Sequence, residues 1–316
     1  MPAAPAGIAD AVAILHAHAP RLAPDVSRTL AALLAEVEAV PAGAGLSLNA
    51  DGGAVEFACS SLSADLRYVV DFGGAVRTRL ARIADWLAAH GAGAGDLAAA
   101  RRLQAQGAPR WGAWLGVRHR PGAPPAFKVY VEVPPGTEPG GSGLIHPPGW
   151  PEQDGTALRP LLVGLGPEEG AREFYFEGRA RGMPVARLAG LLGRLGLAEH
   201  LEDLVALVGA FEFRRGGGRL PDIRFGFSER ATPTGPPVFS LIAFAQDFAG
   251  GDAELRAALL RCADRRGFDL GPYADLTASF AARPAGGSRH NMITFLVGAG
   301  IGPGLQVSFR PPALSD

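Results

Sequence analysis

The sequence predicts an α+β fold, a closed ten-stranded antiparallel β-barrel surrounded by helices. Short segments in which apolar and polar residues alternate occur in five consecutive pairs. Amphipathic helical segments follow most of these pairs, and they would cover the apolar faces of the strands. The polar faces would then point into the lumen, as in residues 127–133, where Lys128, Tyr130 and Glu132 alternate with aliphatic and aromatic side chains.

The expected elements follow one another in a repeating order. A helical N-terminal region covers about residues 8–40, with breaks near Pro20 and Pro24. The strand pairs are 54–60 with 65–72, 111–120 with 127–133, 161–165 with 172–178, 223–228 with 238–244, and 291–297 with 305–310. The helices between them are 76–90, 96–106, 185–195, 198–208, 253–266 and 273–280.

Paired strands do not fit a doubly wound parallel sheet, in which single strands alternate with helices. Closure into a barrel removes exposed strand edges, and ten strands leave room for a ligand chamber. We therefore expect one barrel domain over residues 1–316, with a helical region at 1–50 and a Gly/Pro-rich loop at 134–155. Two α+β domains divided at that loop are the alternative.

Composition limits the classes of function. The net charge of −1 gives no electrostatic reason to expect binding to nucleic acid or to an anionic membrane. Cys59 and Cys262 are too far apart in sequence to indicate a metal pair or a disulfide framework, so a cytoplasmic location is expected. The start of the chain does not resemble a signal peptide, and no segment is apolar for long enough to span a bilayer. High Ala, Gly, Pro and Arg with little Lys is typical of a GC-rich bacterial gene.

Alternation assigns the polar face of each strand to the lumen. The polar side chains on these faces are Glu56, Ser60, Arg67, Asp71, Lys128, Tyr130, Glu132, Glu173, Tyr175, Glu177, Arg224 and Ser228. Unpaired buried charges are unfavourable, so these groups either pair with one another or bind a charged ligand. The alternatives are that Lys128 and Glu132 lie on a solvated strand face and that Arg67 pairs with Glu56.

In strand position and spacing, these residues resemble the ABBA-type aromatic prenyltransferases, especially the dimethylallyltryptophan synthases and other indole prenyltransferases. Glu56 resembles their acceptor of the indole N–H, and Arg67 resembles a diphosphate-binding arginine. Lys128 and Tyr130 resemble their Lys-x-Tyr strand, which supplies a diphosphate ligand and a tyrosine that shields a carbocation. Tyr175 resembles a second shielding tyrosine. The resemblance covers about residues 55–311 and implies a PT barrel of repeated α-β-β-α units with the active site in its lumen.

The resemblance implies an enzyme that moves a dimethylallyl or similar short prenyl group from an allylic diphosphate to an aromatic acceptor. The acceptor would be an indole, as a small molecule or in a Trp-containing peptide, and the setting bacterial secondary metabolism such as alkaloid biosynthesis. Fixed cations would stabilise the pyrophosphate, and aromatic faces would stabilise the allyl cation. Arg67 stands where some bacterial members have a metal-assisting aspartate, and no Asp-Asp-x-x-Asp motif is present. No cofactor is therefore expected, and magnesium is not expected to be essential.

Three strands depart from the family pattern. Residues 171–175 read Ala-Arg-Glu-Phe-Tyr where indole enzymes commonly have Arg-x-Lys-x-Tyr, and Glu173 would repel a diphosphate. The strand at 238–242 lacks Gln-x-Tyr, and residues 305–310 contain no tyrosine. The candidate replacements for the missing diphosphate ligands are Arg224, Arg289, His290, Gln306 and Arg310. A non-catalytic ligand-binding barrel of the same fold, or a prenyltransferase acting on a peptide side chain, is the alternative function.

Other prominent residues have structural interpretations. Trp111 and Trp114 are expected to pack the third strand or to stack on an acceptor ring. His146 and Trp150 lie in the Gly/Pro-rich loop, which is a surface connection or a lid. His119 is expected at a barrel end, and the same position is the alternative for His290. The basic run at 214–219 lacks the Lys-Ser/Thr of a phosphate-binding loop and is expected to form a flexible turn.

Overall fold

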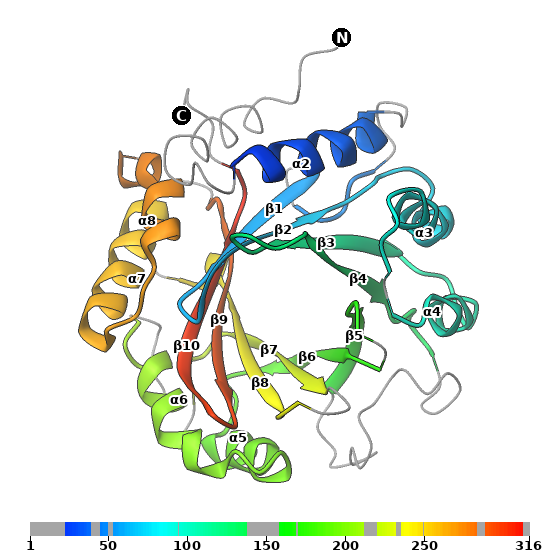
Figure 1. Cartoon of the computed structure of the whole chain (residues 1–316). Helices are drawn as coiled ribbons and strands as arrows, with labels where there is room; N and C mark the ends of the chain where they lie inside the picture. Colours follow the sequence, from blue (N-terminus) through cyan, green and yellow to red (C-terminus); the bar gives the residue numbers. More distant parts are fainter. Residues whose placement is uncertain are drawn as a thin grey trace.

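A single closed antiparallel barrel of ten strands forms the centre of the molecule, and helices surround it (Figure 1). This is a computed structural model, and it describes residues 23–38, 45–49, 53–93, 95–137, 158–168, 170–211, 220–231, 235–248, 250–282 and 288–311. The strand order around the barrel is β1-β10-β9-β8-β7-β6-β5-β4-β3-β2. The predicted fold class is therefore confirmed.

The strands match the predicted pairs in order. They are β1 (Val55–Ser60), β2 (Ser63–Val70), β3 (Ala113–His119), β4 (Ala126–Glu132), β5 (Leu158–Leu165), β6 (Arg172–Arg181), β7 (Arg224–Ala231), β8 (Val238–Phe244), β9 (His290–Gly298) and β10 (Ile301–Phe309). β4 pairs with β5, with Val129 opposite Leu165. The alternative of two domains divided at residues 134–155 is therefore wrong.

The helices lie outside the sheet and follow the chain around it (Figure 1). They are α2 (Ala23–Glu38), α3 (Arg79–Ala89), α4 (Leu97–Gln104), α5 (Val185–Arg194), α6 (Leu201–Val208), α7 (Asp252–Arg266) and α8 (Gly271–Leu276). Short 3-10 turns are η1 (Val76–Thr78), η2 (Ala198–His200), η3 (Ala245–Asp247) and η4 (Ala278–Ala282). Local sequence sets several ends: the Asp96 side chain caps α4 by accepting a hydrogen bond from the Ala99 N–H at 2.8 Å, and α7 ends at Gly267 with φ +65°.

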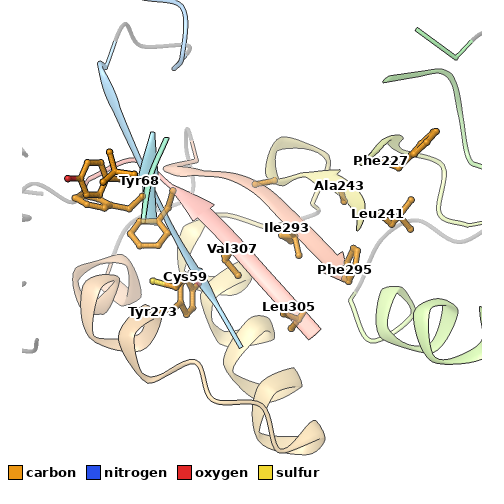
Figure 2. Packing of buried hydrophobic residues seen from close by; sticks show 14 of the residues in the cluster. Cys59, Tyr68, Phe227, Leu241, Ala243, Tyr273, Ile293, Phe295, Leu305 and Val307 are labelled. Atoms are coloured by element: carbon orange, nitrogen blue, oxygen red, sulfur yellow. The ribbon is translucent and has the colours of Figure 1, made fainter. Parts of the chain in front are cut away.

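The hydrophobic core is a layer between the outer face of the barrel and the helices. Phe57, Phe295 and Val307 point outward and are fully buried. Figure 2 shows part of this layer, where Tyr273 of α8 lies beside Cys59 of β1. Burying a large apolar side chain of this kind contributes roughly 1.5–3 kcal/mol, so the outer faces stabilise the barrel and leave the polar faces for the lumen.

Buried polar groups attach the outer layer to the barrel. Arg79 at the start of α3 pairs with Asp71 at 3.0 Å, and these side chains are 1% and 0% exposed. On the outer face of β9, His290 contacts the Tyr273 hydroxyl at 2.8 Å and Asp252 at 2.6 Å. The suggestion that His290 replaces a diphosphate-binding cation is therefore wrong, because its side chain points away from the lumen.

The two ends of the barrel differ in their connections. The direct links between paired strands, such as the turn from β1 to β2, lie at one end, which we call the hairpin end. The connections that contain helices leave from the other end, which we call the helix end. Several expected features, namely residues 8–22, most of the 134–155 loop with His146 and Trp150, and the basic run at 214–219, lie outside the described residues.

Candidate active site

An ion pair held between two tyrosines lies in the lumen. The Lys128 ammonium pairs with the Glu173 carboxylate and donates a hydrogen bond to the Tyr175 hydroxyl at 3.2 Å. Its nitrogen lies 4.9 Å from the ring centre of Tyr130 and 5.3 Å from that of Tyr175. The Ser228 hydroxyl donates to the other oxygen of Glu173 at 2.6 Å. Lys128 and Glu173 are 24% and 16% exposed, so protein encloses them while their surfaces still face open lumen.

Two glycines on the neighbouring strands leave space for the side chains of this cluster. Gly116 on β3 lies opposite Lys128, and Gly164 on β5 lies opposite Tyr130. A Cβ atom at residue 116 would lie 2.7 Å from the Tyr130 ring, and one at residue 164 would collide with the Lys128 side chain. Because β5 separates β4 from β6, the missing side chain at Gly164 is what lets Lys128 reach Glu173.

The cluster fixes the protonation states of its members. Burial acts to lower the pKa of Lys128, but the Glu173 carboxylate outweighs it and the pKa is raised. Burial acts to raise the pKa of Glu173, but Lys128 and the hydrogen bonds from Ser228 and Tyr175 lower it to about 2. Burial and the nearby Glu173 raise the pKa of Tyr175 well above its usual value. At neutral pH the ion pair therefore has no net charge, and the Tyr175 ring is neutral.

Arg67 and Gln306 form a second polar group across the seam between the first and last strands. Arg67 on β2 donates to the Gln306 side-chain oxygen at 2.6 Å and to the Ser63 hydroxyl at 3.3 Å. Both contacts draw the guanidinium toward the hairpin end. The alternative pairing of Arg67 with Glu56 is therefore not observed.

Glu56 occupies a separate environment toward the helix end. Its side chain is 5% exposed and accepts a hydrogen bond from the Asn291 amide, which also donates to the Asn49 side chain at 2.7 Å. Burial raises the pKa of Glu56, against the opposing effects of Asn291, Ser308 and Arg310. The carboxyl is therefore a better proton acceptor than an exposed glutamate.

The predicted diphosphate ligands lie in two separate parts of the barrel. Arg67, Lys128 and Gln306 face the middle and the hairpin side of the lumen. Arg310 follows β10, and its charge acts on Glu56 near the helix end. Arg224 begins β7, where it is exposed and stacks on the Phe244 ring at 5.9 Å. Arg224 and Arg310 are therefore separated from the Lys128 cluster.

Two lumen arginines were missed at the sequence level. Arg118 on β3 lies directly opposite Arg67, and Arg230 on β7 lies directly opposite Glu173. Arg118 shares its side of β3 with Trp114, so alternation alone identifies it as a lumen residue. Arg230 was missed because the predicted strand stopped at residue 228, whereas β7 continues to Ala231.

A cavity of about 590 Å³ opens beside β4 and β5 at the helix end. Trp111 lines it together with Arg110, Glu132 and Arg159, and Trp111 stacks on Trp114 with ring centres 3.8 Å apart. Glu132 is 3% exposed, and its carboxylate accepts hydrogen bonds from the backbone N–H groups of residues 110–112 at 2.7–2.9 Å. The alternative that Glu132 is a solvated charge is therefore wrong, because it fixes the loop at the mouth of the barrel.

Within the described part of the chain, no three His, Cys, Asp or Glu side chains are grouped so as to hold a metal ion. The same residues include no helix that is long and apolar enough to cross a membrane.

The barrel shares its fold with solved prenyltransferase structures. No protein-family model matches the chain, and no curated protein matches its sequence. Solved structures do match it. The 5-dimethylallyltryptophan synthase from Streptomyces coelicolor superposes with a TM-score of 0.70 at 16% identity, with 97% of each chain covered.

Two further solved structures agree. The 6-dimethylallyltryptophan synthase from Micromonospora olivasterospora, in complex with DMASPP and Trp, has a TM-score of 0.64 and 19% identity, with 96% of this chain and 97% of that chain covered. The prenyltransferase PriB with its product diphosphate has a TM-score of 0.63 and 20% identity, with 96% and 99% covered. Similarity at this level of identity establishes the fold.

Proposed function

We propose that this protein is an aromatic prenyltransferase that moves a dimethylallyl or similar short prenyl group from an allylic diphosphate to an indole. The observation that carries the proposal is the position of Lys128 between the faces of Tyr130 and Tyr175 inside a barrel of this fold. A cation next to two aromatic faces suits a substrate that separates into an anion and a carbocation. The solved complexes of similar barrels with DMASPP and tryptophan support this choice.

The proposed reaction is an electrophilic aromatic substitution. The C–O bond of the donor breaks, and its electron pair leaves with the pyrophosphate. An indole carbon attacks the allyl cation and a C–C bond forms. The ring carbon then passes its proton to a general base, for which the released pyrophosphate is available, and aromaticity is restored. We assign Arg67, Lys128 and Gln306 to the leaving group, and Tyr130 and Tyr175 to the cation. The closed barrel limits access of water, which would otherwise trap the cation.

Glu56 is the proposed catalytic residue on the acceptor side. Its buried carboxylate would accept the indole N–H, which orients the ring and raises the electron density at the attacking carbon. The raised pKa of Glu56 strengthens that interaction. We propose that no metal ion is essential, because the guanidinium and ammonium groups provide positive charge where the leaving group would lie.

The setting of the activity is also a proposal. Prenylated indoles are precursors of alkaloids, and the composition of the chain is typical of a bacterial gene, so we place the enzyme in bacterial secondary metabolism. Cys59 and Cys262 are both free and buried, which fits the reducing cytoplasm.

A second candidate is a barrel that binds an isoprenoid or aromatic ligand without turnover. One observation favours it: Glu173 neutralises Lys128, so one expected diphosphate ligand is already paired. A third candidate, prenylation of a peptide side chain, differs from the first only in the acceptor.

Incubation with dimethylallyl diphosphate and a panel of tryptophan, indole derivatives and Trp-containing peptides tests the proposal by mass spectrometry. We expect an acceptor to gain one dimethylallyl group. The product should be lost in Lys128→Ala and Glu56→Ala and retained in Arg102→Gln, which changes an exposed residue of α4 on the outer surface. Donor binding without product over the whole panel would identify the non-catalytic barrel.

A further inference from the structure

Three arginines from three strands converge on the hairpin side of the lumen. We call Arg67, Arg118 and Arg230 the arginine ring. Arg67 and Arg118 are directly opposite each other on β2 and β3, and Arg230 is opposite Glu173 on β7. The Arg118 side chain is 40% exposed and Arg230 is also exposed, so both guanidinium groups reach open space.

Positive charge exceeds negative charge at this end. Asp65 is shared by Arg118 at 3.6 Å and Arg120 at 3.4 Å, and Glu173 pairs with Lys128. Among the residues that the structure describes, Arg67 and Arg230 have no acidic partner. The Nε–H of Arg67 is buried without a hydrogen-bond acceptor in the same part of the chain. The groups counted here are two carboxylates, Asp65 and Glu173, and five cations, Arg67, Arg118, Arg120, Lys128 and Arg230. They leave an excess of about three positive charges, which matches the charge of a fully ionised diphosphate monoester.

The electrostatic environment agrees with this count. Burial lowers the pKa of Arg118, and the neighbouring charge of Arg67 lowers it further, with Arg120 and Arg230 adding to the effect against Asp65. Arg230 acts in the same direction on Lys128. These cations therefore repel one another in the unliganded barrel, and an anion placed among them would relieve that repulsion.

We propose that Arg118 and Arg230 bind the donor diphosphate together with Arg67, at the hairpin end of the lumen. The inference rests on the proposed function and names two residues of the same site. Guanidinium groups pair with phosphate oxygens through two parallel hydrogen bonds, so three of them can surround a diphosphate from different strands. The diphosphate would point toward the hairpins and the prenyl chain toward Tyr130 and Tyr175.

The position of Glu56 fits this orientation. Glu56 and Ser60 lie on the same face of β1 and are four residues apart, about 13 Å along the strand. Ser60 is opposite Gln306, the partner of Arg67, so β1 extends from the proposed anion-binding end to Glu56. A diphosphate, a short prenyl group and an aromatic acceptor placed end to end would occupy that interval.

Titration calorimetry with inorganic pyrophosphate tests the proposal on the purified full-length chain. Arg118→Gln and Arg230→Gln should each weaken pyrophosphate binding at least tenfold, because each removes a charge-assisted contact. Arg118→Lys keeps the positive charge but loses the two parallel hydrogen bonds of the guanidinium. It should weaken pyrophosphate binding less than Arg118→Gln does. Arg102→Gln removes a charge on the outer surface and should leave the affinity unchanged. Circular dichroism of each variant checks that the fold is retained.

The outcomes separate this proposal from the proposed function. If wild-type protein fails to bind pyrophosphate, or if both glutamine variants bind it as Arg102→Gln does, the arginine ring is not the diphosphate site, whether or not the enzyme turns over. If the two variants weaken pyrophosphate binding but wild-type protein prenylates no acceptor, the site stands and the transferase activity fails. An increase in the donor KM in both variants, with product still formed at saturating donor, supports both.

Discussion

Removing the carboxylate of Glu173 should strengthen donor binding and weaken the fold. Glu173 holds the Lys128 ammonium by an ion pair, and a diphosphate must compete with it for that ammonium. The substitution Glu173→Gln keeps the size of the side chain and a hydrogen-bond acceptor for Ser228, but it removes the negative charge.

The pKa of Glu173 gives the scale of the effect. It falls from the usual 4.5 to about 2, which corresponds to roughly 3 kcal/mol of favourable interaction in the ionised state. Because a folded-state pKa below the unfolded value stabilises the protein at higher pH, this contribution is complete above pH 4.5 and is lost as the pH falls toward 2. Pyrophosphate affinity should therefore increase by about ten- to a hundredfold in the variant, and the unliganded fold should lose roughly 3 kcal/mol or less.

Calorimetry with pyrophosphate and thermal unfolding with and without it provide the assay. Glu177→Gln is the matched control, because Glu177 lies four residues further on the same face of β6 and pairs with Arg159 at 2.5 Å. We expect no increase in affinity in this control. If Glu173→Gln binds pyrophosphate no more tightly than wild type, Glu173 does not compete for the anion, and the assignment of Lys128 to the leaving group is refuted.

Three further changes test the site and the fold. Glu56→Gln should reduce turnover about a hundredfold without changing pyrophosphate affinity, and the wild-type rate should decline on the acid side at a pH above 4.5, because burial raises the pKa of this carboxyl. His119 is buried against the Tyr68 hydroxyl at 3.0 Å, and burial lowers its pKa to about 4, so between pH 6.5 and pH 4 only the unfolded chain gains the proton. Urea unfolding should therefore show a loss of roughly 2 kcal/mol from pH 6.5 to pH 5, and His119→Gln should reduce this loss. Arg79→Met should destabilise the protein by about 3–5 kcal/mol, because it leaves Asp71 charged and buried.

Each of these expectations has a contradicting result. A Glu56→Gln enzyme with wild-type turnover would exclude this carboxylate from the chemistry. Equal pH dependence of unfolding in wild type and His119→Gln would show that His119 titrates normally in the folded state. The control for Arg79→Met is Arg77→Met, which changes an exposed residue of the preceding turn, and similar stability of the two variants would contradict the role of the buried ion pair.

Strand alternation was enough to predict the fold, because it is a local property of the chain. Residues 127–133 alternate so strictly that the lumen positions of Lys128 and Tyr130 followed from parity, and the amphipathic helices indicated which face of the strands was covered. Strand ends were harder to predict. The end of β7 was placed too early, because Glu229, Arg230 and Ala231 have no apolar alternation, and Arg230 was lost with it.

Alternation within one strand could not predict which polar side chains contact each other across the lumen. Lys128 meets Glu173 only because β4, β5 and β6 have a particular register and because β5 has a glycine between them. Asn291 reaches Glu56 only after the first strand and the last hairpin are brought together. An irregularity between Pro160 and Leu162 shifts the register of β5 against β6. Such contacts depend on the arrangement of several strands at once, so the pattern of one strand does not determine them.

The seam between β1 and β10 also affects how the protein must assemble. The contacts Arg67 to Gln306 and Glu56 to Asn291 join residues that are 239 and 235 positions apart. Bringing together residues so far apart in sequence has a large entropic cost. Folding is therefore expected to be slow, because nearly the whole chain must be ordered before these contacts form. During synthesis on the ribosome, both ends of the lumen therefore remain incomplete until β10 has emerged. A chain cut before β10 would lack Gln306, and it would lack the strand that holds Asn291 of β9 beside Glu56 of β1. It would also expose two strand edges, which favour aggregation.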